Sequence, residues 1–241
     1  RRDVAAVCGP GLSPMFRGLL EEASGIVSES KFCWGNVAFR NRSEGKVREV
    51  EDFITANLIV RRSDYKSVGG FGTAFWPGED TSFCLNIIEK LDKKIIYDPR
   101  VLVYHTRRLP GLPYLKQVAG YGLHRGYFAK ILPRTSLRLP YFVPSFFVVG
   151  IIGGASLVGV KVIFPNSGQL LTNSLLGICA SVLSTYFILL FYKFLEILKS
   201  RKNLTLALLI PPGIISVHIV YGLRFLQGFL FTKKLISKYR D

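Results

Sequence analysis

The second half of the chain is dominated by three long apolar segments without a charged side chain. They cover Leu139–Val160, Leu170–Tyr192 and Asn203–Leu223. Each has about the 20 residues that a helix needs to cross a hydrocarbon layer about 30 Å thick. The pattern predicts an α-helical transmembrane region of two to three helices over residues 139–232, followed by a basic tail over residues 233–241.

The third apolar segment differs from the other two because Pro211-Pro212-Gly213 lies in its interior. Proline interrupts the hydrogen-bond ladder of a helix, so we expect either a kinked span or a re-entrant hairpin. Lys and Arg favour the cytosolic side, and they flank the first two segments at residues 134–138 and 193–202. A full third span would carry the basic tail to the opposite side, whereas a re-entrant segment would not.

Two polar residues, His218 and Arg224, lie in or beside this third segment. One interpretation is that they contact a lipid phosphate. The other is that the histidine packs between helices and the arginine extends toward the membrane surface. The sequence favours the second interpretation and leaves both open.

The first half of the chain has short apolar runs separated by glycine, proline and charged residues. Strands are expected at Val4–Cys8, within Asp52–Arg61, at Lys94–Asp98 and at Val101–His105. Helices are expected at Phe16–Val27, from Arg62 with Ser63 as N-cap, at Thr81–Leu91 and at Pro113–Leu132, with a surface loop at residues 40–49. Strands interleaved with helices indicate an α/β fold.

The composition of the whole chain excludes some classes of protein. The 241 residues include 32 Lys+Arg against 16 Asp+Glu, and 49% are hydrophobic. This apolar content excludes an intrinsically disordered chain, and the long apolar segments exclude a purely soluble protein. The four cysteines (Cys8, Cys33, Cys84 and Cys179) have no paired spacing, which indicates reduced thiols.

A basic amphipathic juxtamembrane segment is expected over residues 109–138, between the α/β domain and the first apolar segment. From residue 100 to 138 the chain has eight basic side chains and no acidic one. They are Arg100, Arg107, Arg108, Lys116, Arg125, Lys130, Arg134 and Arg138. They suit attraction to anionic lipid, at about 1 kcal/mol each near the surface, or a groove for the phosphate of a lipid-linked acceptor. Nucleic acid is not expected as a partner, because no binding motif is present.

The sharpest candidate for chemistry is Gly78-Glu79-Asp80, at the expected start of a helix. A carboxylate held there could act as a general base and take a proton from a hydroxyl group as it attacks. The alternative is a helix cap, because acidic side chains favour the positive end of the helix dipole.

An ordered set of motifs surrounds these carboxylates. The set comprises Ala56-Asn57-Leu58-Ile59-Val60-Arg61-Arg62, Val68-Gly69-Gly70-Phe71, Gly78-Glu79-Asp80, Ile96-Tyr97-Asp98-Pro99 and Tyr104-His105-Thr106-Arg107-Arg108. In this order they resemble the second half of a family 2 glycosyltransferase with the GT-A fold. The membrane region resembles the exopolysaccharide, succinoglycan-type branch. The resemblance implies a partial, Rossmann-like GT-A domain over residues 1–108, followed by the transmembrane helices.

The resemblance also implies an activity, namely inverting, hexosyltransferase-type transfer from a nucleotide-sugar donor. It makes Asp80 the catalytic base. The residues that it implies for binding the acceptor are Glu79, Ala56, Asn57 and Trp76. The residues that it implies for binding the donor diphosphate are His105, Arg107, Arg108 and Arg125. For His105 and the two arginines beside it, a solvated basic turn is the alternative.

This chain departs from the family pattern in two ways. It contains no Asp-x-Asp, the motif that holds a divalent cation (Mg or Mn) in the nucleotide-binding half. Because the chain starts at Arg1 and its first Met is Met15, we expect a fragment of a longer enzyme that is inactive by itself. It also lacks Gln-x-x-Arg-Trp, and Tyr121–Gly126 instead resembles the Tyr-Gly-x-x-Arg pattern of the exopolysaccharide branch, which favours single-sugar transfer over polymer extrusion.

Together these features predict a multi-pass plasma-membrane (inner-membrane) glycosyltransferase whose catalytic part is cytosolic. Its acceptor would be a polyprenyl-phosphate-linked sugar or a polysaccharide. The alternative is a non-catalytic membrane protein whose degenerate domain docks a partner or anionic lipid. A transporter subunit is a weaker hypothesis, because the apolar segments contain few polar residues to form a substrate path.

Overall fold

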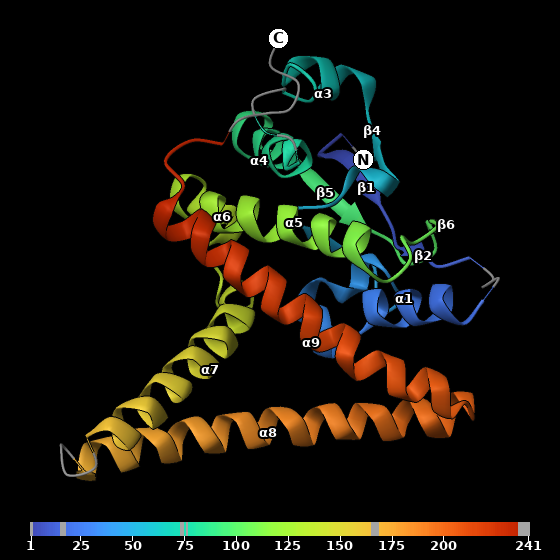
Figure 1. Ribbon diagram of the computed structural model, residues 1–241. Coiled ribbons are helices and arrows are strands. Elements are labelled where there is room, and N and C mark those ends of the chain that lie inside the picture. The colour runs from blue at the N-terminus through green and yellow to red at the C-terminus, as the bar shows by residue number, and fades with distance from the viewer. Residues whose placement is uncertain (1, 15–17, 73–74, 76, 165–168, 236–241) are drawn as a thin grey trace.

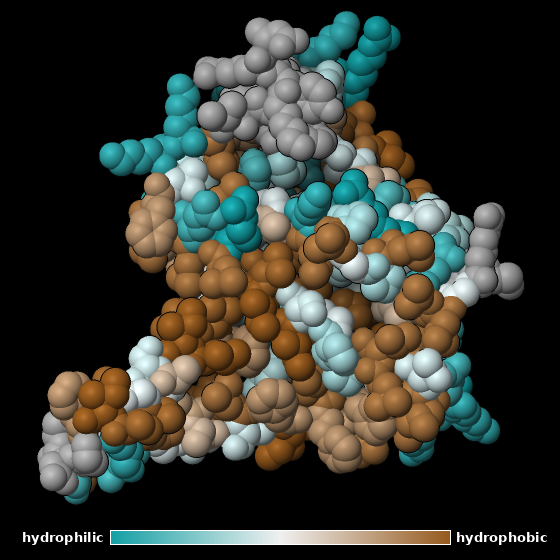
Figure 2. Space-filling model, viewed as in Figure 1, coloured by the Kyte–Doolittle hydropathy of each residue, from teal (hydrophilic) through white to brown (hydrophobic). Residues whose placement is uncertain are grey.

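The computed structural model describes residues 2–14, 18–72, 75, 77–164 and 169–235. Its polar half holds a small sheet and short helices, and its second half holds three long helices that enclose a triangle (Figure 1). In Figure 2 apolar residues cover most of the lower part of the molecule, while polar residues gather at the top.

The sheet of the polar half has four short strands in the order β3-β5-β1-β4. These strands are β1 (Val4–Cys8), β3 (Arg48–Val50), β4 (Leu58–Val60) and β5 (Lys94–Tyr97). The central pair, β1 and β5, is parallel, and both outer strands are antiparallel to their neighbours. Strands β2 (Gly11–Leu12) and β6 (Val103–Tyr104) form a separate parallel pair. Buried side chains on this sheet, including Tyr97 and Ile95, pack against Phe53, Phe83 and Ile87.

Six α-helices belong to the described part of the polar half. They are α1 (Leu19–Glu29), α2 (Lys31–Trp34), α3 (Arg62–Ser67), α4 (Glu79–Leu91), α5 (Leu112–Ile131) and α6 (Pro133–Ser136), with 3₁₀ turns at Gly35–Arg40 and Thr55–Asn57. The structure confirms the expected strands at Val4–Cys8, Lys94–Asp98 and Val101–His105, the last one only over Val103–Tyr104. It also confirms the expected helices from Arg62, over Thr81–Leu91 and over Pro113–Leu132. The first expected helix begins later, at Leu19, and part of its predicted start lies outside the described residues.

Two local predictions were wrong. The N-cap of α3 is Arg61 and not Ser63, and no side chain caps it. Residues 48–50, expected within or beside a surface loop, pair with β5 because Arg48 can lie over the rings of Phe39 and Tyr97. The strand expected within Asp52–Arg61 is confirmed over Leu58–Val60, after a 3₁₀ turn at Thr55–Asn57.

The fold class expected from the sequence is present in its coarse form, which is a small sheet with helices followed by a helical membrane-type region. The helices α7 (Leu139–Ile163), α8 (Gln169–Arg201) and α9 (Leu204–Leu226, continued by a π turn at Gln227–Phe231) are long and apolar enough to cross a bilayer. Pro211 and Pro212 lie inside α9, which continues through them as one helix, so the structure favours a continuous helix over the alternative of a re-entrant hairpin.

Helix α9 is packed far more closely against the protein than the other two apolar helices. In the most apolar stretch of each helix, the buried share is 44% for α9, against 11% for α7 and 6% for α8. It lies against α1 and α5 of the polar half as well as against α7 and α8 (Figure 1). This surrounding explains why two prolines are tolerated, because neighbouring helices hold the segment in place.

Glycines bring α5 and α9 close together. A Cβ atom at Gly122 would lie 2.6 Å from the carbonyl oxygen of Tyr221, and one at Gly126 would lie 2.1 Å from that of Phe225. The contacts therefore advance along both helices in the same direction, so α5 and α9 run parallel. Spacing small residues four apart allows two helix backbones to approach this closely.

His218 of α9 is buried within the protein. Its ring nitrogens lie 2.9 Å from the hydroxyl group of Tyr186 and 3.1 Å from the carbonyl oxygen of Cys33. Arg224 donates a hydrogen bond to Gln227 at 2.5 Å. These contacts favour the interpretation of His218 as a helix-packing residue over a lipid-phosphate ligand.

Replacing Gly126 tests the contact between α5 and α9. Gly126→Ala places a methyl group against the backbone of Phe225, and we expect a loss of about 1–3 kcal/mol in the free energy of unfolding. Gly120→Ala is the matched control, because it lies in the same helix and its added Cβ would only touch Pro77 at 3.8 Å. The measurement is thermal unfolding in detergent. Equal stability of the two variants would contradict the close contact.

Candidate functional site

The start of α4 is held against α5 by a glycine. Gly78, the N-cap of α4, has φ of 122°, a conformation that side chains other than glycine rarely adopt. A Cβ atom there would also lie 2.6 Å from the ring of Phe128 in α5. The first turn of α4, which carries Glu79 and Asp80, is therefore fixed on the juxtamembrane helix.

Both carboxylates of this turn bind backbone N–H groups. Glu79 accepts a hydrogen bond from the N–H of Gly78 at 2.9 Å, and Asp80 accepts one from the N–H of Thr81 at 2.8 Å. The alternative interpretation of these residues as partners of the helix start is thus correct in part. Neither bond uses all the oxygen lone pairs of the carboxylates, which leaves acceptor capacity on each side chain.

A buried ion cluster that the sequence did not indicate lies beside Asp80. The Asp52 carboxylate, whose side chain is 7% exposed, is 3.1 Å from the guanidinium of Arg40 and 2.8 Å from that of Arg125. Thr81 donates its hydroxyl group to the same carboxylate at 3.2 Å. Burial alone would raise the pKa of Asp52, but the two arginines hold it below its usual range.

This environment makes Asp80 a stronger base than an ordinary aspartate. Burial and the negative charge of Asp52 raise the pKa of Asp80 to about 6, and Glu79 adds to the effect, while Arg40 opposes it. The group is therefore ionised at neutral pH and holds a proton more firmly than a solvated carboxylate. That combination suits a general base.

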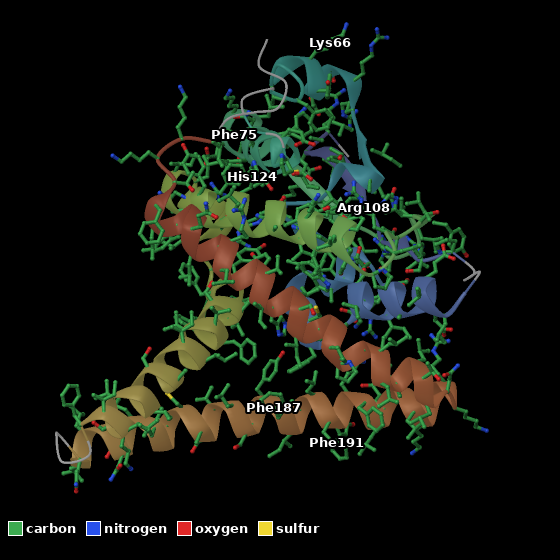
Figure 3. The ribbon with its side chains drawn as sticks, viewed as in Figure 1. Lys66, Phe75, Arg108, His124, Phe187 and Phe191 are labelled. Carbon is green, nitrogen blue, oxygen red and sulfur yellow. The ribbon has the colours of Figure 1, made fainter. Side chains whose placement is uncertain are left out.

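Tyr121 in α5 links Asp80 electrostatically with the basic residues that follow β6. Burial raises the pKa of Tyr121, the charge of Asp80 raises it further, and Arg108 and Arg107 lower it. Asp80, Arg107 and Arg108 are thus all near enough to Tyr121 for their charges to affect its pKa. Figure 3 shows Arg108 beside α5, with His124 and Phe75 closer to α4.

Several predicted donor ligands already have partners inside the protein. Arg107 donates to the carbonyl oxygen of Gly11 and, at 3.4 Å, to the hydroxyl group of Ser13. Arg125 lies in the cluster with Asp52. His105 is exposed at the end of β6, and partial burial with the neighbouring Arg107 lowers its pKa. Arg108 is exposed, and no ion pair of its side chain is present among the described residues.

The predicted acceptor residues are dispersed. Ala56 is exposed. Asn57 is buried, and its amide donates to the carbonyl oxygens of Gly9 at 2.9 Å and Val101 at 2.8 Å, so both amide hydrogens stabilise the fold. Trp76 lies outside the described residues. Only Glu79 lies directly beside Asp80, and the acceptor-binding roles of all four residues stay predictions.

Most of the basic side chains between residues 100 and 138 have partners within the protein. Arg100 pairs with Asp98, Arg138 with Glu51, and Arg134 with Glu51 and Glu89. Lys130 donates to the carbonyl oxygen of Thr232. Arg108 and Lys116 are the exposed members of the set without such a described partner, and the phosphate groove expected from the composition stays a prediction.

Metal-binding residues do not gather in the part of the chain that the structure describes. No group of three or more His, Cys, Asp or Glu side chains there could hold a metal ion. The divalent cation expected from the resemblance therefore has no ligand set among these residues. All four cysteines are free thiols, and burial raises the pKa of Cys8 to about 12.

An apolar pocket of about 250 Å³ opens between α1, the start of α5 and α9. Its walls include Leu20, Val27, Tyr114, Leu209 and Pro212. Pro110 and Gly111 also line it, and the carbonyl oxygen of the nearby Arg108 accepts a hydrogen bond from Ser24 of the pocket wall at 2.5 Å. A hydrocarbon chain in this pocket would thus lie close to Arg108.

Comparisons with known proteins identify no family for this chain. No protein-family model, no curated protein and no solved structure matches it.

The raised pKa of Asp80 predicts an unusual effect of pH on stability. An acid whose folded pKa exceeds its unfolded value of about 3.9 binds more protons in the folded state, so stability falls as pH rises from about 4 to 6. We expect Asp80→Asn to remove this dependence and to increase stability at pH 7.5 by roughly 1–2 kcal/mol. Chemical unfolding at pH 4.5 and 7.5 measures it, with Asp92→Asn at the other end of α4 as control. A less stable Asp80→Asn protein at pH 7.5 would contradict the account.

Proposed function

We propose that this chain is the acceptor-side part of a membrane-bound inverting glycosyltransferase, with Asp80 as its general base. The observation that carries the proposal is Asp80 itself, a partly buried carboxylate with a pKa raised to about 6 at the first turn of α4. The ordered motifs around it in the sequence support the same activity.

In the proposed reaction Asp80 takes the proton of an acceptor hydroxyl group. The oxygen of that group forms a bond to the anomeric carbon of the donor sugar from the opposite face to the diphosphate. The bond between this carbon and the diphosphate oxygen breaks, and the leaving nucleoside diphosphate carries away the electron pair. Arg108, exposed and near Tyr121, is available to bind negative charge on the donor or acceptor.

A lipid-linked acceptor fits this site better than a free polysaccharide. The pocket between α1, α5 and α9 has mostly apolar walls, and it adjoins Arg108 at the level of the apolar helix α9. A polyprenyl phosphate combines the two groups that such a surface binds, a hydrocarbon chain and an anion. The acceptor sugar would then extend along α5 toward Asp80.

For the membrane arrangement we propose two spans, α7 and α8, with α9 lying along α5 at the cytosolic surface. Near its end α9 stays beside the polar half, because Tyr127 donates to the carbonyl oxygen of Lys233 at 3.4 Å and Lys130 to that of Thr232 at 2.5 Å. The basic residues 134–138, 193–202 and 233–234 then all lie on one side, as the positive-inside rule requires.

Labelling of single cysteines tests this arrangement. In sealed membranes, an impermeant maleimide should label Arg134→Cys and Lys233→Cys from the same side and Ile163→Cys, at the far end of α7, from the other. The unsubstituted protein measures the background from the four native thiols. Labelling of Lys233→Cys together with Ile163→Cys would show instead that α9 crosses the membrane.

Substitution of Asp80 tests the chemistry. In the protein expressed from its full natural reading frame, Asp80→Asn should lower sugar transfer from a nucleotide sugar to polyprenyl phosphate by about 10²–10⁴-fold. Asp92→Asn makes the same change at the exposed C-terminal end of α4 and should leave transfer unchanged.

Two outcomes would oppose the proposal. Equal transfer by the Asp80→Asn and native proteins would remove Asp80 as the base. Absence of transfer by the native protein with every nucleotide sugar tested would favour the alternative, in which the domain docks a partner or anionic lipid without catalysis.

A further inference from the structure

The cluster around Asp52 is not explained by substrate binding. Its carboxylate is almost fully buried and already faces two guanidinium groups and a hydroxyl group. Removing one partner would leave a buried charge uncompensated. The free-energy cost of that change is far larger than the net stability that the ion pair contributes. The cluster therefore fixes the relative positions of the segments that supply its members.

One of these segments carries the proposed base. Thr81 contacts both aspartates, because its hydroxyl group donates to Asp52 at 3.2 Å and its backbone N–H donates to Asp80 at 2.8 Å. Thr81 is itself 2% exposed, so its side chain has little freedom to turn elsewhere. Movement of the Asp52 carboxylate would thus move the turn that holds Asp80.

The other side of the cluster reaches the membrane helices. Arg125 of α5 lies 4.9 Å from the ring centre of Tyr141 in α7 and donates to Ser136 of α6 at 3.3 Å. The same guanidinium binds Asp52 at 2.8 Å. Contacts are therefore continuous from the first apolar helix through Arg125 and Asp52 to the first turn of α4.

We propose that Asp52 is a positioning residue that acts through Thr81 to hold the Asp80 carboxylate in place relative to α5 and α7. The inference rests on the proposed function, since it assigns to Asp80 the role of base. It gives Arg125 a different role from the diphosphate ligand expected from the sequence, because its guanidinium binds the buried Asp52 carboxylate.

The charged and titratable groups around Asp80 make this role measurable. Burial raises the pKa of Asp80, the charges of Asp52 and Glu79 raise it further, and Arg40 lowers it. Tyr121 and Cys84 are close enough for the charge of Asp80 to raise their pKa values. Replacing Asp52 by asparagine removes one negative charge and leaves Arg40 and Arg125 positive. The pKa of Asp80 should therefore fall below about 6.

The first test follows Asp80 without using activity. A water-soluble carbodiimide modifies protonated carboxyl groups, and peptide mass spectrometry measures the modified fraction of Asp80 against pH. In the native protein the midpoint should lie near 6, and in Asp52→Asn it should lie lower. An unchanged midpoint in the folded variant would overturn the inference.

A second pair of variants covers the case in which Asp52→Asn does not fold. Thr81→Val keeps the shape of the side chain and loses only the hydroxyl group that binds Asp52, whereas Thr81→Ser keeps that group. We expect Thr81→Val to lower kcat about 10–100-fold with the KM for the nucleotide sugar unchanged, and Thr81→Ser to restore it. Asp80 should also be modified faster by carbodiimide in Thr81→Val than in Thr81→Ser.

These measurements separate failure of the inference from failure of the proposed function. Faster labelling of Asp80 in Thr81→Val than in Thr81→Ser, in a protein that transfers no sugar, would support the positioning role and reject the enzyme. Normal transfer and equal labelling in Thr81→Val and Thr81→Ser would reject the positioning role and leave the enzyme intact.

Discussion

A single buried carboxylate joins the sheet of the polar half to α5, the helix that packs against the apolar region. Asp52 can be ionised away from water only because Arg40 and Arg125 supply opposite charge at 3.1 and 2.8 Å. Those residues come from a 3₁₀ turn near the sheet and from the juxtamembrane helix, while Thr81 brings the start of α4 to the same point. The geometry of the candidate base thus depends on an ion cluster that joins the sheet domain to the membrane-proximal helices.

The close packing of α5 on α9 extends this connection into the apolar region. Gly122 and Gly126 allow the helix backbones to approach, and the contacts near Lys130 and Tyr127 keep the end of α9 beside the polar half. In the proposed arrangement α9 lies along α5 at the membrane surface. The basic segments of the chain would then lie on one side of the membrane without a break in α9 at Pro211 and Pro212. Helix α9 also forms one wall of the apolar pocket next to Arg108.

Local patterns predicted much of the fold, and long-range contacts account for what they missed. Apolar segments of sufficient length predicted α7 and α8, and the adjacent acidic residues after Gly78 predicted the start of α4. The Arg40–Asp52–Arg125 cluster could not be predicted, because Arg125 follows Asp52 by 73 positions and only the tertiary fold joins them. The close spacing of Gly122 and Gly126 was a usable signal for helix packing, but it does not identify α9 as the partner.

We propose that the environment of Asp80 makes this carboxylate a base suited to neutral pH. The most direct test of this proposal is an infrared titration of the carboxylate groups, taken as the difference between the native and Asp80→Asn proteins. The account predicts one titrating group with a midpoint near pH 6. A midpoint near the ordinary aspartate value of about 3.9 would contradict it, because Asp80 would then have no more affinity for a proton than a solvated carboxylate.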